Sequence, residues 1–293
     1  MMLITGATGQ LGASVVSHLI QKVGATAFTT LARDEAKADR LREGHVNVRY
    51  GDFDKPDTLG SALAGIKKLL LISTMAHNRA DQHRNVVDAA KKAGVEHIFY
   101  TSLAIRSIEN SHVRGLMNSH FETEDYIKAS GMKHTILRNT MYAEAIPMIV
   151  GSGLIGSSIA LPGGDGRVPY VLREELAEAT ANAISSNGHE SRTYNLVGFE
   201  SYGYSDVAAS LAKLQRTRLS YHQIGPDHFH KHMAANHAST FEIYLTKGTV
   251  LDIRDHQYEI ESRDLQMLLG RTSKGLEAMA AEVFAHTNNR ENQ

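Results

Sequence analysis

Short hydrophobic runs alternate with segments of helical periodicity along the first half of the chain. The runs predict six strands, at residues 2–5, 27–32, 46–50, 68–73, 96–101 and 133–138. Between them, apolar residues recur at the spacing of one helix face, as in the segment 11–20. Strands that alternate with helices pair in parallel through right-handed crossovers. Because the strands are apolar throughout, the pattern predicts an α/β fold with a doubly wound parallel sheet.

The pattern loosens after residue 138. A glycine-rich stretch at 151–167 predicts a mobile connection, and helix and strand patterns then follow at 173–185, 192–197 and 218–224. The remainder is largely helical. We therefore expect two domains: residues 1–150 as the sheet domain, and residues 151–293 as a smaller, mostly helical C-terminal lobe for substrate. The lobe is expected to pack on the sheet domain, with some segments returning to it.

The composition excludes several classes of function. Of the 293 residues, 42% are hydrophobic and 22% charged, as in soluble globular proteins. A formal net charge of -1 argues against a nucleic-acid partner or an anionic membrane. The absence of cysteine excludes disulfides, thiolate catalysis and cysteine-based metal centres. Hydrophobic runs such as 69–72 are too short to span a membrane, and we expect a cytoplasmic protein.

Three glycines, Gly6, Gly9 and Gly12, follow the first predicted strand and open the first predicted helix. In this context the spacing permits a tight turn, the approach of a pyrophosphate to the backbone, and close packing of helix on strand. Backbone N–H groups and the helix dipole then bind the anion. The predicted dinucleotide contacts in this turn are Gly6, Ala7, Thr8, Gly9, Gln10, Leu11 and Gly12. The alternative is an ordinary strand–helix turn that uses glycine.

The ends of the second and third strands carry the residues that would recognise the rest of a dinucleotide. Arg33 stands where a 2′-phosphate is recognised, which favours NADPH over NADH, while Asp34 is predicted to cap the next helix. The alternative is that Asp34 binds the ribose hydroxyls. Asp52 and Phe53 are placed to bond and flank an adenine, although a capping role for Asp52 fits the pattern equally well.

With these residues in place, the chain resembles the NmrA-like atypical short-chain dehydrogenase/reductases, and among them the quinone oxidoreductase type 2 and triphenylmethane reductase branch. The matching stretches include "ITGATGQLG", "QHRNVVDAAKKAGVEHIFYTS" and "LRNTMY". The resemblance implies a Rossmann fold, and it implies nicotinamide-side contacts after the sixth strand and at Arg173. The cleft is expected at the carboxyl ends of the strands. This position and the resemblance together give the candidate contacts Ile72, Ser73, Thr74, Thr101, Arg138, Asn139, Thr140 and Arg173.

The proton-donating dyad of most short-chain dehydrogenases, Tyr-x-x-x-Lys, is absent, because no tyrosine is followed by lysine four residues later. Where related plant-type reductases have a lysine, this chain has His120. A quinone or a cationic dye is electron-poor and takes hydride without a strong enzymatic acid. Asn139, Tyr142 and His77 are the candidates for positioning such a substrate, by hydrogen bonding or ring stacking. Ordinary packing of Tyr142 and a solvated loop position for His77 are the alternatives.

We therefore expect an NADPH-dependent oxidoreductase for a planar, electron-poor small molecule, working without flavin or metal. His228, His230 and His232 lie too close in sequence to form a regular three-ligand metal site, and a solvated face is favoured. An alternative function is a non-catalytic NAD(P)-binding redox sensor that regulates a protein partner. A sugar-nucleotide epimerase would need the missing dyad. An apolar helix face of the first domain could form a homodimer, but the pattern does not separate it from core.

Overall fold

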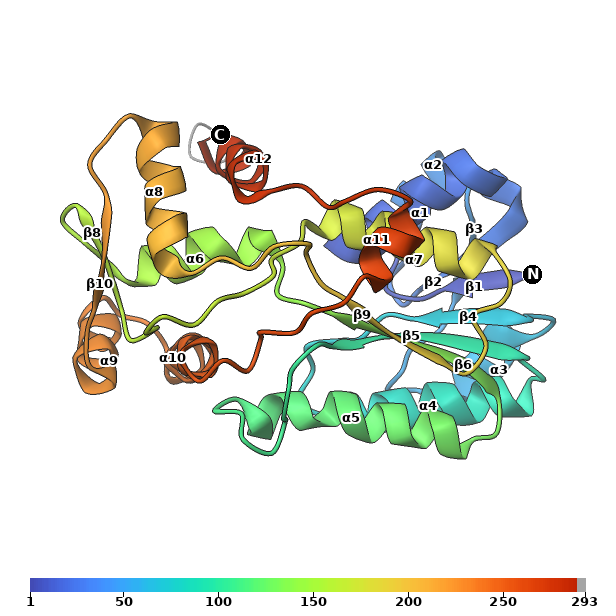
Figure 1. Ribbon diagram of the computed structural model, residues 1–293. Coiled ribbons are helices and arrows are strands. Elements are labelled where there is room, and N and C mark those ends of the chain that lie inside the picture. The colour runs from blue at the N-terminus through green and yellow to red at the C-terminus, as the bar shows by residue number, and fades with distance from the viewer. Residues whose placement is uncertain (289–293) are drawn as a thin grey trace.

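A seven-stranded parallel sheet forms the centre of the computed structural model, which describes residues 1–288 (Figure 1). Every neighbouring pair in it is parallel. In spatial order, the strands are β3 (Asn47–Tyr50), β2 (Phe28–Ala32), β1 (Met2–Ile4), β4 (Lys68–Leu71), β5 (His97–Leu103), β6 (Lys133–Asn139) and β9 (Arg192–Leu196). The order changes direction between β1 and β4, where doubly wound sheets bind their ligands.

Helices cover both faces of this sheet, which confirms the doubly wound prediction (Figure 1). One layer contains α1 (Gln10–Val23), α2 (Glu35–Glu43), α7 (Arg173–Ser185) and α11 (Asp264–Leu269). The other contains α3 (Leu59–Leu63), α4 (Arg79–Lys92) and α5 (Arg114–Ala129). A separate hydrophobic cluster fills the space under each layer. All five residues of β2 are buried, as expected for a strand covered on both sides.

Local signals in the sequence set several helix boundaries. The carboxylate of Asp34 accepts hydrogen bonds from the backbone N–H groups of Ala36 and Lys37, which confirms it as the N-cap of α2. Pro56 opens a short 3₁₀ turn, Pro56–Thr58, that leads directly into α3. These boundaries matter for the site, because they fix where β2 and β3 end and where the loops that follow them begin.

A smaller lobe lies beyond the carboxyl ends of the strands, on the left of Figure 1. Its own sheet has three strands in the order β10-β8-β7, and its hydrophobic cluster is separate from those of the large sheet. Its elements are α6 (Ile146–Ser152), β7 (Leu154–Ile155), β8 (Ser158–Leu161), α8 (Tyr204–Gln215), β10 (Ser220–Gln223), α9 (Pro226–Ala235), α10 (Thr240–Arg254) and α12 (Leu276–Asn288). Between these, β9 and α7 return to the large sheet and pack there.

The glycine-rich stretch at 151–167, predicted as a mobile connection, contains regular secondary structure that the pattern did not predict. The segment holds the end of α6 and a β7–β8 hairpin, and Ile159 and Leu161 of β8 are fully buried in the lobe. The hairpin turn is Gly156-Ser157, with Gly156 at φ +59°. A Gly-Ser pair between two short apolar runs is a hairpin signal, and glycine permits the left-handed conformation. The division of domains near residue 150 stays a prediction.

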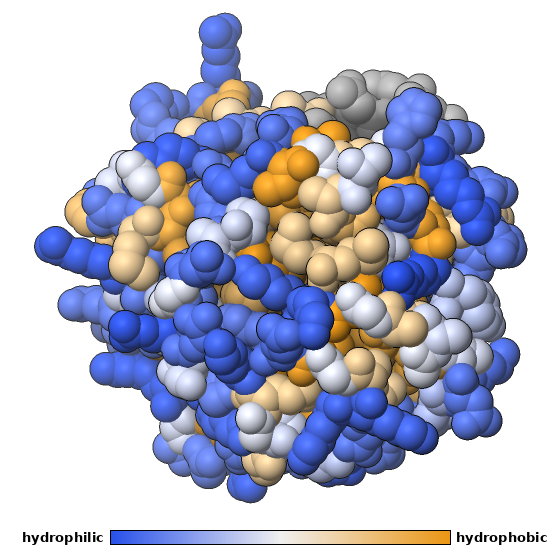
Figure 2. All heavy atoms as spheres, turned by 90° about the vertical axis from the view of Figure 1, so that its right-hand side faces the viewer, coloured by the Kyte–Doolittle hydropathy of each residue, from blue (hydrophilic) through white to orange (hydrophobic). Residues whose placement is uncertain are grey.

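The opposite end of the molecule, at the amino ends of the strands, presents hydrophilic side chains around a central group of more hydrophobic ones (Figure 2). Within residues 1–288, no helix combines the length and the apolar character needed to cross a bilayer. Doubly wound sheets bind their ligands at the carboxyl ends of the strands, so we expect a ligand site at the end of the sheet that faces the lobe.

Candidate functional site

A cavity of about 890 Å³ lies at the carboxyl ends of the strands, between the large sheet and the smaller lobe. Its volume falls within the range of about 300–1,000 Å³ typical of ligand pockets. Residues that follow β1, β2, β3, β4 and β6, and the last two residues of β5, contribute to its wall, and α5, α6 and α10 close the far end. The cavity therefore occupies the place predicted from the change in strand order.

The glycine turn after β1 forms one wall. Gly6 has φ +63°, which favours glycine, and a Cβ on Gly12 would lie 2.0 Å from the carbonyl oxygen of Gly6. No side chain caps the start of α1, and its first turn has no acidic residue. The free N–H groups of this turn and the helix dipole therefore favour an anion in the cavity. Gly6, Thr8, Gly9, Gln10, Leu11 and Gly12 line it, whereas Ala7 is fully buried.

Arg33, Asp52 and Phe53 meet at the next part of the wall. Arg33 is exposed and makes no hydrogen bond within the described chain, so its guanidinium is available to a ligand. Asp52 lines the cavity and also accepts a hydrogen bond from the N–H of Asp54 at 3.1 Å. This contact stabilises a turn and caps no helix, because the next 3₁₀ helix has Lys55 at its N-cap. This combination offers a cation beside an aromatic ring and a carboxylate.

Gln82 on α4 is a cavity residue that the sequence did not reveal. Its amide donates to Asp54 at 2.9 Å and accepts from the hydroxyl of Thr74 at 2.9 Å. Hydrogen bonds from Gln82 and Asn78 hold the pKa of Asp54 below its usual range. The network fixes the loop after β4, whose residues Ile72, Ser73 and Thr74 line the cavity as expected.

The inner wall carries two buried oxygen atoms without partners in the described chain, Oδ1 of Asn139 and Oγ1 of Thr140. Buried polar atoms normally have a hydrogen-bond partner, so these two point to a ligand that supplies one. Tyr142 accepts a long hydrogen bond, 3.5 Å, from the amide of Asn139, and burial raises the pKa of its hydroxyl. The guanidinium of Arg173 lies 4.7 Å from the Tyr142 ring centre. The carboxylate of Glu144 accepts a hydrogen bond from the backbone N–H of Arg173, the first residue of α7.

Three further predicted site residues do not line the cavity. Thr101 is buried, and its hydroxyl accepts the N–H of Ser73 at 2.9 Å. Arg138 is held away by two hydrogen bonds to Glu124, at 2.6 and 2.8 Å. His77 packs edge-on against Phe241, with ring centres 5.9 Å apart. Each of these side chains is engaged elsewhere, and their predicted contacts with cofactor or substrate stay predictions.

The far end of the cavity is mainly apolar, and the sequence did not reveal most of its residues. They come from distant segments of the chain: Met75, Met117, Met141, Met148, Ile149, Leu245 and Tyr258. The main polar exceptions are Thr246, Thr249 and His120. His120 had drawn attention only as the residue where related reductases have a lysine. An apolar wall with a few polar groups is typical of a site for a flat organic molecule.

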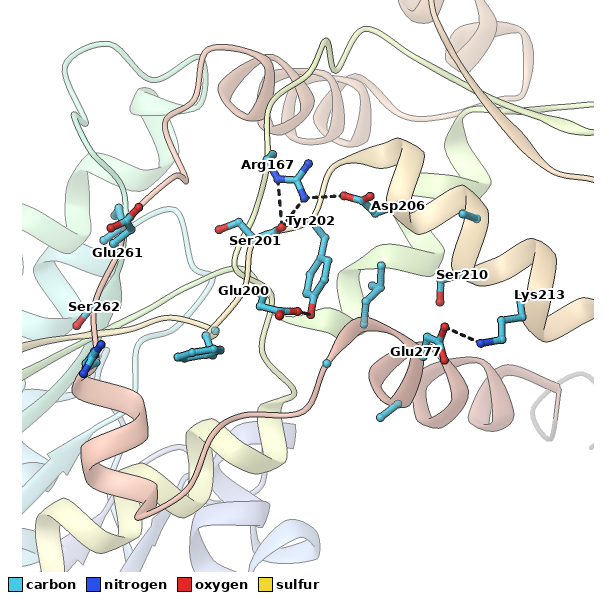
Figure 3. A pocket seen from close by; sticks show the side chains of 18 residues that line it. Arg167, Glu200, Ser201, Tyr202, Asp206, Ser210, Lys213, Glu261, Ser262 and Glu277 are labelled. Atoms are coloured by element: carbon cyan, nitrogen blue, oxygen red, sulfur yellow. Dashed lines mark hydrogen bonds and ion pairs between the residues drawn. The ribbon is translucent and has the colours of Figure 1, made fainter.

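A second, larger groove of about 1310 Å³ lies between the lobe and residues 260–263 (Figure 3). Four of its charged groups form ion pairs: Arg167 with Asp206 at 2.8 Å, and Lys213 with Glu277 at 2.7 Å. Arg167 also donates to the backbone oxygen of Ser201. The first turn of α12 lines this groove, but it carries the acidic Glu277, and none of the unpartnered buried oxygens found in the described chain belongs to a lining residue. The smaller cavity is therefore the candidate site.

Comparison with known proteins agrees with this location. Residues 6–187 match the family described as NAD(P)H-binding. Quinone oxidoreductase 2 of Escherichia coli is 33% identical to this chain in an alignment that covers 98% of this chain and 100% of that protein. An NmrA-like family domain-containing oxidoreductase of Aspergillus flavus is 33% identical over 78% of this chain and 75% of its own.

The solved structures give the same relationship. NADPH-dependent quinone oxidoreductase from E. coli, complexed with NADPH, has a TM-score of 0.90 at 33% identity, covering 97% of this chain and 100% of its own. Triphenylmethane reductase of Citrobacter sp., complexed with NADP(H), has a TM-score of 0.86 at 32% identity, and the match covers 96% of this chain and 99% of that one. Together with the glycine turn and the sheet topology, these matches establish that the chain belongs to the NAD(P)H-binding, NmrA-like family.

Proposed function

We propose that this protein is an NADPH-dependent oxidoreductase that passes hydride to a quinone or another planar, electron-poor acceptor. The observation that carries the proposal is one continuous cavity with two chemically different ends. An anion-binding helix start and Arg33 stand at one end, and an apolar wall at the other. The similarity to a quinone oxidoreductase and a triphenylmethane reductase supports the same pairing of cofactor and acceptor.

The residues present fit the cofactor. The first-turn N–H groups of α1 would hold the pyrophosphate, and Arg33 would hold the 2′-phosphate through a charge-assisted pair. The unpartnered oxygens of Asn139 and Thr140 would accept hydrogen bonds from the carboxamide of the nicotinamide. Arg173 and Asp52 are further polar groups on the wall. When bound, NADPH supplies the hydride.

The chain's own residues would act mainly by positioning. Methionines from α5 and α6 and the Tyr142 ring offer flat apolar contact, which suits a planar ring and excludes water. Among the described residues that line the cavity there is no lysine. An acceptor that already draws electrons does not need a strong acid, since a quinone becomes a stabilised phenolate and a cationic dye becomes neutral. The cavity suits these acceptors better than a simple ketone.

Steady-state oxidation of NADPH and NADH by the purified protein tests the proposal, with a panel of quinones, cationic dyes and azo dyes as acceptors. We expect turnover with NADPH and at least one acceptor class, followed through loss of the reduced-nicotinamide absorbance. Tight NADPH binding by calorimetry without turnover across the panel would contradict the proposal. That result would favour the alternative of a redox sensor.

A further inference from the structure

A buried polar cluster lies directly behind the apolar end of the cavity. It consists of Arg79 and His83 on α4, Tyr100 on β5, and His120 and Thr123 on α5. All five are buried, Arg79 completely, and Nε and Nη1 of Arg79 have no hydrogen-bond partner within the described chain. Of the five, His120 alone reaches the cavity wall. The contacts proposed for the cofactor do not use this cluster.

The hydrogen bonds of the cluster define which atoms carry protons. Thr123 donates its hydroxyl proton to the backbone oxygen of Ser119 at 2.7 Å. Nδ1 of His83, 3.0 Å from the Thr123 oxygen, must therefore be the donor of that pair. Burial and the charge of Arg79 lower the pKa of His83 to about 3, so its ring is neutral. The cluster thus contains one permanent cation, Arg79, beside neutral rings.

The same reasoning fixes the proton on His120. Nδ1 of His120 lies 3.0 Å from the hydroxyl of Tyr100. The positive charge of Arg79 favours the orientation in which the lone pairs of the Tyr100 oxygen lie toward the cation and its proton lies toward His120. Burial, together with Arg79 and His83, lowers the pKa of His120 well below its usual value, so the ring is neutral. Its single proton then sits on Nε2, the nitrogen not engaged by Tyr100.

We propose that His120 donates a hydrogen bond from Nε2–H to the oxygen of a bound quinone, and that Tyr100 is the positioning residue that fixes this tautomer. The inference rests on the proposed function and deepens it. Hydride from NADPH brings two electrons and one hydrogen to the quinone, which leaves one oxygen as an anion, and water later supplies the single proton that completes the hydroquinone. A neutral N–H donor in a dry cavity stabilises this developing charge without giving up its own proton.

This role divides the acceptors into two classes. A quinone develops negative charge on oxygen when it takes hydride, and it therefore gains from the His120 donor. A cationic triphenylmethane dye takes hydride at carbon and becomes neutral, so no oxygen anion forms. Removal of the donor should therefore lower the rate of quinone reduction and leave the rate of dye reduction nearly unchanged. The two classes share the cofactor and the cavity, so each variant carries its own internal control.

The test compares His120→Ala, His120→Gln and Tyr100→Phe with the wild type on a benzoquinone and a cationic triphenylmethane dye. We expect His120→Ala to lower kcat/KM for the quinone about a hundredfold, the loss typical of one removed oxyanion donor. The dye rate should change less than about twofold. His120→Gln, which keeps an N–H donor, should recover most of the quinone rate. Tyr100→Phe should lower kcat/KM for the quinone about threefold to tenfold, which corresponds to the loss of one neutral hydrogen bond.

Two measurements independent of turnover accompany the rates. NADPH affinity by fluorescence titration should stay at the wild-type value in each variant, which also shows that the variants fold. Nitrogen-15 NMR should find the His120 proton on Nε2 in the wild type, and this preference should weaken in Tyr100→Phe. Equal losses on both acceptors, or a proton on Nδ1, would overturn the role of His120. Failure of the proposed function looks different, because the wild type would then bind NADPH and turn over neither acceptor.

Discussion

Arg33 is a cation at the edge of the cavity that makes no hydrogen bond within the described chain, and we propose that the choice between NADPH and NADH depends on it. We expect Arg33→Ala to lower kcat/KM for NADPH about tenfold to a hundredfold, the value of one to two charge-assisted hydrogen bonds. The value for NADH should stay nearly constant. Arg42→Ala removes the same charge from α2, where Arg42 pairs with Glu35 and Asp39, and serves as the control. A parallel loss for NADPH and NADH would contradict the assignment of Arg33.

Glu124 is a buried carboxylate, 1% exposed, that binds Arg138 and the hydroxyl of Ser102. Burial alone would raise its pKa, but the hydrogen bonds of Arg138 and Ser102 outweigh burial and hold the pKa below the ordinary value of 4.5. Since the folded pKa is the lower one, this stabilisation is present above about pH 4.5 and is lost as the pH falls through the folded pKa. Glu124 therefore contributes to stability at neutral pH.

We expect Glu124→Gln to lower the free energy of unfolding by about 3 kcal/mol at neutral pH, because one partner of a buried pair is removed. Urea denaturation at several pH values measures this, and the difference from the wild type should shrink below about pH 4.5. Glu122→Gln, an exposed position of the same helix, should change stability by less than about 0.5 kcal/mol. A difference between wild type and Glu124→Gln that does not vary with pH would contradict the account.

At the scale of elements, the junction of β1 and α1 depends on the absence of a side chain at Gly12. An alanine Cβ there would lie 2.0 Å from the oxygen of Gly6, so backbone must move. We expect Gly12→Ala to lower the free energy of unfolding by about 1–3 kcal/mol, as for an overpacked site. NADPH affinity, measured by calorimetry, should fall by more than about tenfold, since the anion-binding turn shifts.

Gly60→Ala is the matched control for this change. Gly60 lies in α3, and nothing lies within 4 Å of an added Cβ. Alanine should leave NADPH binding unchanged and raise the free energy of unfolding by up to about 1 kcal/mol, because glycine is costly in a helix. If Gly12→Ala behaved like Gly60→Ala, the turn after β1 would not be the anion site.

The elements of the large sheet were predictable because each strand is buried on both faces and each helix has a clear end. The predicted strand at 27–32 and the observed β2 differ by one residue, and α7 has the predicted bounds. The lobe was harder, since β7 has only two residues, both exposed. The apolar end of the site was largely hidden, because Met117, Met148 and Leu245 come together only through tertiary packing.

At the scale of the whole molecule, α10 of the lobe is tied to the first domain through Asp252. This carboxylate is fully buried and accepts hydrogen bonds from the Ser111 hydroxyl at 2.6 Å and the His112 N–H at 2.7 Å. Leu245, about two turns away on the same helix, lines the apolar end of the cavity. The position of the lobe therefore affects the acceptor end more than the cofactor end.

We expect Asp252→Ala to raise the KM for the acceptor about tenfold while NADPH affinity stays close to the wild-type value, because removal of a buried acceptor leaves Ser111 and His112 without their partner. Steady-state kinetics and fluorescence titration measure the two quantities separately. Asp227→Ala, an exposed acid of the same lobe, is the control and should change neither. A fall in NADPH affinity that equals the loss of acceptor binding would contradict separate roles for the two ends of the cavity.

Direct transfer of hydride from NADPH to the acceptor is the central claim, and deuterium labelling tests it most directly. NADPH deuterated at either face of the hydride-donating carbon is oxidised by the protein with a cationic triphenylmethane dye, and the reduced dye is analysed by mass spectrometry. The account predicts deuterium in the product from one face only, because the cavity holds cofactor and acceptor in a single arrangement. Reduced dye without deuterium from either form, or no turnover at all, would contradict direct hydride transfer.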